Sequence, residues 1–183
     1  MRRPFVKSED GFTMVELMIV IGISAIMASV TAVAIRQGSA SFALRRAASL
    51  AVSEIRRAQS SAVAERRDFV VEFGFGASAG VTTYRLTDPP GSTWQQVRSI
   101  GAPGAGLDGE WPAMVTFATA GSTLSACGGG ALPGAGSNKC LKFGMFGEPT
   151  SPAAAGQVVL RNSSGTQLRV VVTPATGQVT VTR

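Results

Sequence analysis

Residues 9–16 read EDGFTMVE, and residues 17–35 continue as LMIVIGISAIMASVTAVAI. From Met14 to Ile35 the chain is predominantly apolar for 22 residues, with one charge, Glu16, and no proline. At 1.5 Å of helical rise per residue, this length spans the hydrocarbon core of a bilayer. A carboxylate at bilayer depth costs about 2.5–3.5 kcal/mol on insertion scales, so the position of Glu16 indicates a function.

Three basic residues, Arg2, Arg3 and Lys7, precede the apolar segment, and the positive-inside rule therefore keeps the N-terminus cytoplasmic. Two ordinary explanations stay open. A secretory signal peptide would end at a small-residue cleavage site, which ASVTA at residues 28–32 offers. A plain signal anchor explains the length of the segment but leaves Glu16 without a reason.

The stretch GFTMVE at residues 11–16, with a basic leader before it and an apolar helix after it, resembles the processing site of type IV prepilins. The resemblance implies cleavage by a prepilin peptidase between Gly11 and Phe12, N-methylation of Phe12 and an assembly role for Glu16. Phe12 and Glu16 are four residues apart and share a helix face. An ammonium on Phe12 opposes the helix macrodipole while the carboxylate complements it, and each charge relieves the burial cost of the other. In pilins the amine belongs to a neighbouring subunit, so the pair would set the assembly register.

A second helical pattern follows the apolar segment. Small and aliphatic residues recur at steps of four and three: Leu44, Ala48, Ala51, Ile55, Ala58 and Ala62. This spacing predicts one helix from about Phe12 to Arg67, whose second half lays a narrow stripe on a sheet. Arg45, Arg56 and Arg67 nearly align on another face, which indicates a solvated polar face, a phosphate-contacting stripe or a docking face.

After Asp68 the pattern changes to short β-type runs bounded by Gly, Pro, Ser or Asn clusters. The runs cover residues 69–73, 81–86, 94–100, 114–119, 140–146, 157–162, 167–174 and 178–183, with tight turns expected at 162–165 and 174–177. The expected fold class is α+β and type IV pilin-like: a long N-terminal helix, transmembrane in its first half, packed on a C-terminal antiparallel sheet domain. The expected division is a leader peptide at 1–11, a transmembrane or filament-core helix at 12–35, an amphipathic continuation at 36–67 and a periplasmic β-rich domain at 68–183.

Glycine-rich sequence fills residues 101–139. It lacks the GKS or GKT and the strand–loop–helix unit of a phosphate loop, so surface loops are expected. The chain has no histidine and two cysteines, Cys127 and Cys140, too few ligands for a structural zinc site. In an extracytoplasmic chain these cysteines most simply form one disulfide, which contributes about 3 kcal/mol. Two reduced thiols are the alternative.

The tail from Leu141 to Arg183 resembles the C-terminal half of the GspH/FimT family, with Phe143, Gly147 and Gly177 at matching positions. The resemblance implies a FimT/FimU-like minor pilin that assembles into, primes or caps a type IV pilus, or a GspH-like pseudopilin of a type II secretion system. The implied partners are the inner membrane, a prepilin peptidase and other pilins or pseudopilins. The implied location is the bacterial inner membrane, single-pass with a periplasmic C-terminal domain, and then the fibre or its tip.

DNA is a second alternative partner, because some FimT-type minor pilins bind DNA through a G-R-x-R turn and strand. This chain has Gln178 and Thr180 where the basic residues would stand. The cations left for DNA contact are Lys139, Lys142, Arg161, Arg169 and Arg183, and the net charge of +6 suits an anionic partner.

Catalysis is not expected. A membrane-anchored hydrolase would need a nucleophile–base pair, which a chain without histidine hardly offers. We therefore expect no enzymatic activity, no cofactor, no metal and no small-molecule substrate.

Overall fold

The computed structural model describes residues 12–75, 79–87, 93–101, 111–127, 133, 138–152, 156–174 and 176–183. The chain forms two compact units, Met1–Gly38 and Ser39–Arg183. The helix α1 (Met14–Glu65) contributes its first part to one unit and its second part to the other. The leader at 1–11 and, within the glycine-rich stretch, residues 102–110, 128–132 and 134–137 lie outside the described residues.

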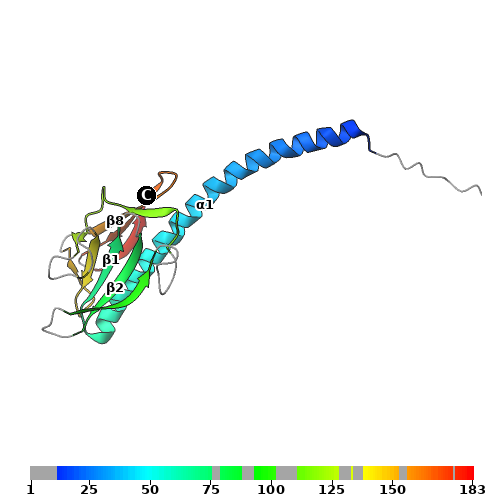
Figure 1. Cartoon of the computed structure of the whole chain (residues 1–183). Helices are drawn as coiled ribbons and strands as arrows, with labels where there is room; N and C mark the ends of the chain where they lie inside the picture. Colours follow the sequence, from blue (N-terminus) through cyan, green and yellow to red (C-terminus); the bar gives the residue numbers. More distant parts are fainter. Residues whose placement is uncertain are drawn as a thin grey trace, which may run out of the picture. The chain divides into compact units, whose positions relative to one another are not determined.

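The second unit contains ten described strands. They are β1 (Phe69–Gly74), β2 (Gly80–Leu86), β3 (Trp94–Ile100), β4 (Val115–Ala118), β5 (Ser125–Ala126), β6 (Lys139–Phe143), β7 (Pro149–Ser151), β8 (Gly156–Asn162), β9 (Gln167–Val172) and β10 (Val179–Thr182). They form two antiparallel sheets (Figure 1). The first sheet has the order β3-β2-β1-β6-β5, with β7 also paired to β6, and the second has the order β10-β9-β8-β4.

Each of the eight predicted runs contains a strand, and the α+β expectation is confirmed. The prediction missed β5 and β7, which are two and three residues long and exist only because they pair with β6. The run predicted at 140–146 ends early, at Phe143, because a turn with Gly147 at φ 80° reverses the chain. The helix also ends earlier than predicted, at Glu65, because Arg66 takes a left-handed conformation with φ 51°.

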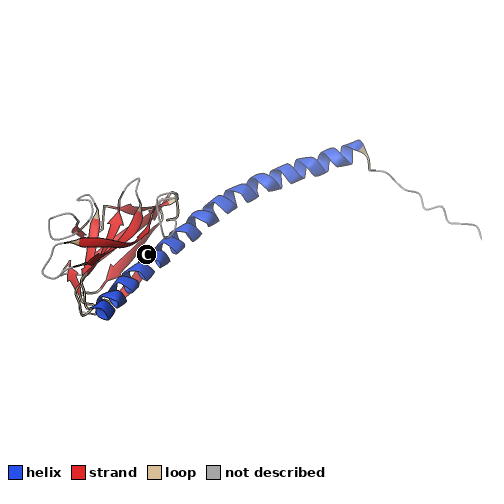
Figure 2. Ribbon diagram, turned by 60° about the horizontal axis from the view of Figure 1, so that its bottom comes forward, coloured by secondary structure: helices blue, strands red, loops and turns tan. Residues whose placement is uncertain are grey.

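The second part of α1 runs alongside the strands of its unit (Figure 2), and the predicted stripe of this part is the helical side of the core. Leu44, Ala51, Ile55, Ala58 and Ala62 belong to one buried cluster. Both sheets contribute to the same cluster, the first through residues such as Phe69, Val71 and Phe143 and the second through residues such as Val158, Leu160 and Val170. Alanine lets a helix backbone approach a sheet closely, so one segment of α1 packs against both sheets.

Aromatic rings join the two sheets in the middle of this core. The ring of Phe117 on β4 lies 5.5 Å from that of Phe73 on β1, in an edge-on arrangement, and 4.7 Å from that of Trp111. Trp111 is buried, and its indole Nε1 donates a hydrogen bond of 2.8 Å to the carbonyl of Val115. The indole N–H of Trp111 therefore has a hydrogen-bond partner although the side chain is buried in an apolar core.

Two turns, one from each sheet, meet at Gln59 of α1. The Gln59 Nε2 donates to the carbonyl of Gly147 at 3.0 Å, and Gly147 lies in the β6–β7 turn. On the other side, a Cβ at Gly177, in the β9–β10 turn, would fall 2.3 Å from the same Nε2. Gly177 also has φ 63°. Both glycines are thus required by a left-handed backbone and by the approach of the helix.

The Gly177→Ala variant of the full chain in detergent should lose about 2 kcal/mol of unfolding free energy in chemical denaturation, through backbone strain and displacement of Gln59. Adding Gln59→Ala should remove the displacement, so that Gly177→Ala then costs only about 1 kcal/mol. Gly165→Ala is the matched control, because Gly165 has φ 82° but its added Cβ would meet only Arg161, at 3.9 Å. Equal costs of Gly177→Ala in both backgrounds would contradict the role given to Gln59.

Candidate functional site

The predicted processing and assembly segment begins with a capped helix. Thr13 precedes α1, and its Oγ1 accepts a hydrogen bond of 3.2 Å from the backbone N–H of Glu16. This is half of a capping box, in which a Thr and a Glu three residues later satisfy the free amides of the first turn. Sequence reasoning had assigned a role to Glu16 but not to Thr13, although the TMVE pattern contains this signal. Gly11 lies outside the described residues, and Phe12 is 80% exposed.

The first unit presents an apolar helical surface. The large side chains of Met14, Leu17, Ile21, Ile26 and Ile35 are all more than half exposed. The hydroxyl groups among them bond back to backbone carbonyls at 2.7–2.9 Å: Ser24 to Val20, Ser29 to Ile26 and Thr31 to Met27. These hydroxyls therefore need no partner from outside the helix.

Within the described residues, none of the helices meets the length and hydropathy required of a membrane span.

The two cysteines form the expected disulfide. Cys127 follows β5 and Cys140 lies in β6, with Cα atoms 5.3 Å apart. Both are buried in a small cluster with Val70, against which Tyr84 and Trp94 pack. The disulfide therefore covers the face of the first sheet opposite α1 and attaches the short β5 to its neighbour.

A buried carboxylate lies beside the disulfide. Glu72 is 6% exposed and accepts hydrogen bonds from the Tyr84 hydroxyl at 2.8 Å and from Asn138 Nδ2 at 2.6 Å. Asn138 in turn accepts from the Phe75 amide at 3.2 Å. Burial, the hydrogen bond to Glu72 and the charge of Glu72 all raise the pKa of Tyr84 far above its ordinary value. Together Glu72, Tyr84, Asn138 and the Phe75 amide form a hydrogen-bonded polar cluster beside the disulfide.

The first two of the predicted DNA contacts lie on β6. Lys142 is engaged in the fold: its Nζ is 2.7 Å from Asp68 Oδ2 and 5.9 Å from the centre of the Trp94 ring. Lys139 is half-buried at the start of the same strand. Lys142 is therefore a structural cation, which sequence spacing did not reveal.

The three predicted arginines divide between two faces of the second sheet. Arg161 and Arg169 are exposed on the face away from α1, because β9 pairs Arg169 with Val159, two residues from Arg161 on β8. Arg183 lines a cavity with Ser41 and Arg45 of α1 instead. The five predicted cations thus do not gather in one patch. Of the five, only Arg161 and Arg169 are neighbours on the same face of a sheet.

The predicted arginine face of α1 contains only two of its three arginines. Arg45 and Arg56 are exposed as a solvated face requires. Arg67 lies beyond the end of the helix and donates to the carbonyls of Leu86 and Thr87. Glu54, on this part of the helix, is buried, and one of its oxygens is 3.2 Å from Arg98 Nε.

A family model matches the N-terminal segment, and a solved structure is similar over a larger part of the chain. Residues 6–32 match the family model described as the prokaryotic N-terminal methylation motif. A crystal structure of the type IV minor pilin FimU from Pseudomonas aeruginosa strain PAO1 is similar at 16% sequence identity and a TM-score of 0.49, covering 76% of this chain and 88% of that chain. No curated protein matches the chain.

The methylation motif covers the predicted cleavage point, the capped first turn and most of the apolar segment. The chain thus combines a prokaryotic N-terminal methylation motif with a long helix, whose second part packs on antiparallel sheets.

Tyr84 is the only tyrosine of the chain, so the change of ultraviolet absorbance on ionisation has no contribution from another phenol. Since the folded pKa is raised, the neutral phenol should persist in the folded protein at pH values where a free tyrosine, with a pKa of about 10, is ionised. The contribution of Tyr84 to the free energy of unfolding is fully present below about pH 10 and is lost as the pH rises further.

The matched variant is Glu72→Gln, which removes the charge but keeps an oxygen acceptor. This variant should lower the pKa of Tyr84 part of the way toward its ordinary value, since burial is the largest cause of the shift and is unchanged. Half-ionisation of folded wild-type protein near pH 10 would contradict the described cluster.

Proposed function

We propose that this protein is a minor pilin of the FimT/FimU kind, which is processed by a prepilin peptidase and assembles into, primes or caps a type IV pilus. The observation that supports this most is the methylation motif at residues 6–32, which runs into a capped helix with an exposed apolar surface. In this proposal the protein works by assembly and not by catalysis.

The proposal includes a single pass through the bacterial inner membrane, with residues 12–35 in the bilayer and the β-rich domain in the periplasm. The exposed apolar side chains of the first unit support it, as do the hydroxyls that bond within the helix. Backbone and hydroxyl groups in hydrocarbon must find their partners inside the segment. The disulfide supports an oxidising compartment for the second unit.

A GspH-like pseudopilin of a type II secretion system is the alternative, since both kinds of subunit would need the same N-terminal segment. DNA uptake has weaker support, because the described cations do not converge and Lys142 is paired with Asp68. DNA retention that falls with salt, and falls further on Arg161→Gln with Arg169→Gln, would favour that alternative.

Purification from the native membrane, followed by N-terminal sequencing and intact mass, tests the proposed processing. We expect a chain that starts at Phe12 and whose mass exceeds that of unmodified residues 12–183 by one methylation. Loss of the prepilin peptidase should leave residues 1–11 attached. A chain that starts near Val33, or that retains Met1 in cells containing the peptidase, would remove the basis of the proposal.

The assembly role of Glu16 is tested by Glu16→Leu. Cleavage after Gly11 should stay normal, because it depends on the residues around the cut. Incorporation into sheared fibres should fall about tenfold, the equivalent of about 1.4 kcal/mol, because the amine of the neighbouring subunit loses its partner.

Glu65→Gln is the control for loss of one carboxylate from α1, since within the described part of the chain Glu65 forms a surface ion pair with Arg85, at 2.9 Å. It should assemble like the wild type. Normal incorporation of Glu16→Leu would mean that Glu16 serves only the helix N-terminus.

A further inference from the structure

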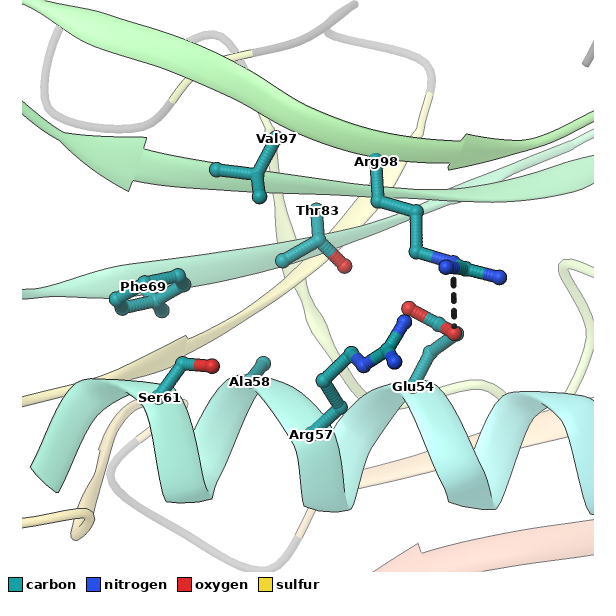
Figure 3. A pocket seen from close by; sticks show the side chains of 8 residues that line it. All are labelled: Glu54, Arg57, Ala58, Ser61, Phe69, Thr83, Val97 and Arg98. Atoms are coloured by element: carbon teal, nitrogen blue, oxygen red, sulfur yellow. Dashed lines mark ion pairs between the residues drawn. The ribbon is translucent and has the colours of Figure 1, made fainter. Parts of the chain in front are cut away.

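A cavity lies between α1 and the edge of the first sheet (Figure 3). Its volume is about 230 Å³, several times the roughly 30 Å³ share of a liquid water. It is lined by Glu54, Arg57, Ala58, Ser61, Phe69, Thr83, Val97 and Arg98. All of these residues belong to the second unit, and β3 above the cavity is an edge strand of its sheet.

One polar group in the cavity has no partner in the described part of the chain. Thr83 is 4% exposed, and its Oγ1 is buried without a hydrogen bond. Figure 3 shows this hydroxyl pointing from the strand toward the helix. An unpaired buried polar group costs about 1–3 kcal/mol, and a valine would fill the same space without that cost. The hydroxyl therefore suggests a bound group that the fold itself does not supply.

The charges around the cavity leave one cation unmatched. Glu54 is paired with Arg98, whose Nε is 3.2 Å from its carboxylate, and the Glu54 side chain is only 6% exposed. Arg57 is exposed and makes no ion pair with any described residue. In Figure 3 its guanidinium extends from the helix toward the space between Glu54 and Thr83. Two guanidinium groups and one carboxylate give this lining a net charge of +1.

Apart from Ser61, the remaining lining residues are apolar. Phe69 is buried at one side, Ala58 forms part of the helical wall, and the half-exposed Val97 lines the cavity from β3 (Figure 3). A suitable ligand therefore has an apolar body and one anionic end. The charge of Glu54 disfavours a second negative charge on the ligand, since like charges at close range raise each other's energy.

We propose that this cavity is a binding site for a monoanionic carboxylate on an apolar stem. The carboxylate accepts hydrogen bonds from the Arg57 guanidinium and the Thr83 hydroxyl, and the stem lies against Phe69 and Val97. Glu54 holds Arg98 in place and excludes dianions such as phosphate. The carboxylate comes either from a free small acid or from an acidic side chain of another polypeptide.

The test uses the full chain in detergent micelles and follows backbone amide shifts by nuclear magnetic resonance. The probes are benzoate, its neutral counterpart benzamide, inorganic phosphate, and acetylated Gly-Glu-Gly and Gly-Gln-Gly amides. We expect saturable shifts around Arg57, Thr83 and Val97 with a carboxylate probe, and none with benzamide, the Gln peptide or phosphate. Saturation by benzoate identifies a free acid as the source, whereas saturation by the Glu peptide alone identifies a protein side chain. Absence of saturation with both, or equal binding of the neutral probes, overturns the proposal.

Three variants separate binding from folding. Arg57→Gln should weaken carboxylate binding about tenfold, the usual effect of losing one charge-assisted hydrogen bond, and leave the melting temperature unchanged. Thr83→Val should weaken binding several-fold while the ligand-free protein melts at the same or a higher temperature. Arg161→Gln removes the same charge from the opposite face of the second sheet and should bind like the wild type. Wild-type affinity in both Arg57→Gln and Thr83→Val would show that the ligand is not bound here.

Discussion

The second unit depends on one contact, between the alanine-rich stripe of α1 and the inner faces of two sheets. Both sheets contribute side chains to the same buried cluster, in which Phe73 and Phe117 also join the two sheets directly. The stripe works because Ala51, Ala58 and Ala62 keep the helix close, while Leu44 and Ile55 fill the remaining depth. Gln59 then fixes the rotation of the helix, since it contacts one turn of each sheet.

Periodicity predicted the parts of this fold that are set locally. The stripe at steps of three and four and the alternating runs of the sheets are both consequences of burial on one face. It could not predict β5 or β7, whose few residues are strands only through pairing with β6. Nor could it place the helix end at Glu65, because Arg66 takes a conformation that more often belongs to glycine or asparagine.

The candidate sites also divide into those that a local sequence pattern predicts and those that depend on contacts between distant residues. The N-terminal motif is contiguous in sequence, so it could be recognised without a fold, although the cap at Thr13 was overlooked. The pairing of Lys142 with Asp68, the burial of Glu54 against Arg98 and the isolated hydroxyl of Thr83 depend on distant strands. A polar residue on a helix looks the same in a sequence whether it faces solvent or an opposite charge.

The hydroxyl groups of Ser24, Ser29 and Thr31 have a further consequence for a helix that moves between surroundings. Each is already bonded to a carbonyl of its own helix. In the proposed assembly, the segment exchanges lipid neighbours for protein neighbours without breaking any of these hydrogen bonds. These three hydroxyl groups therefore add no hydrogen-bond cost to the transfer in either direction, whether a subunit enters the fibre or leaves it. In the same proposal, the carboxylate of Glu16 gains a partner only in the fibre.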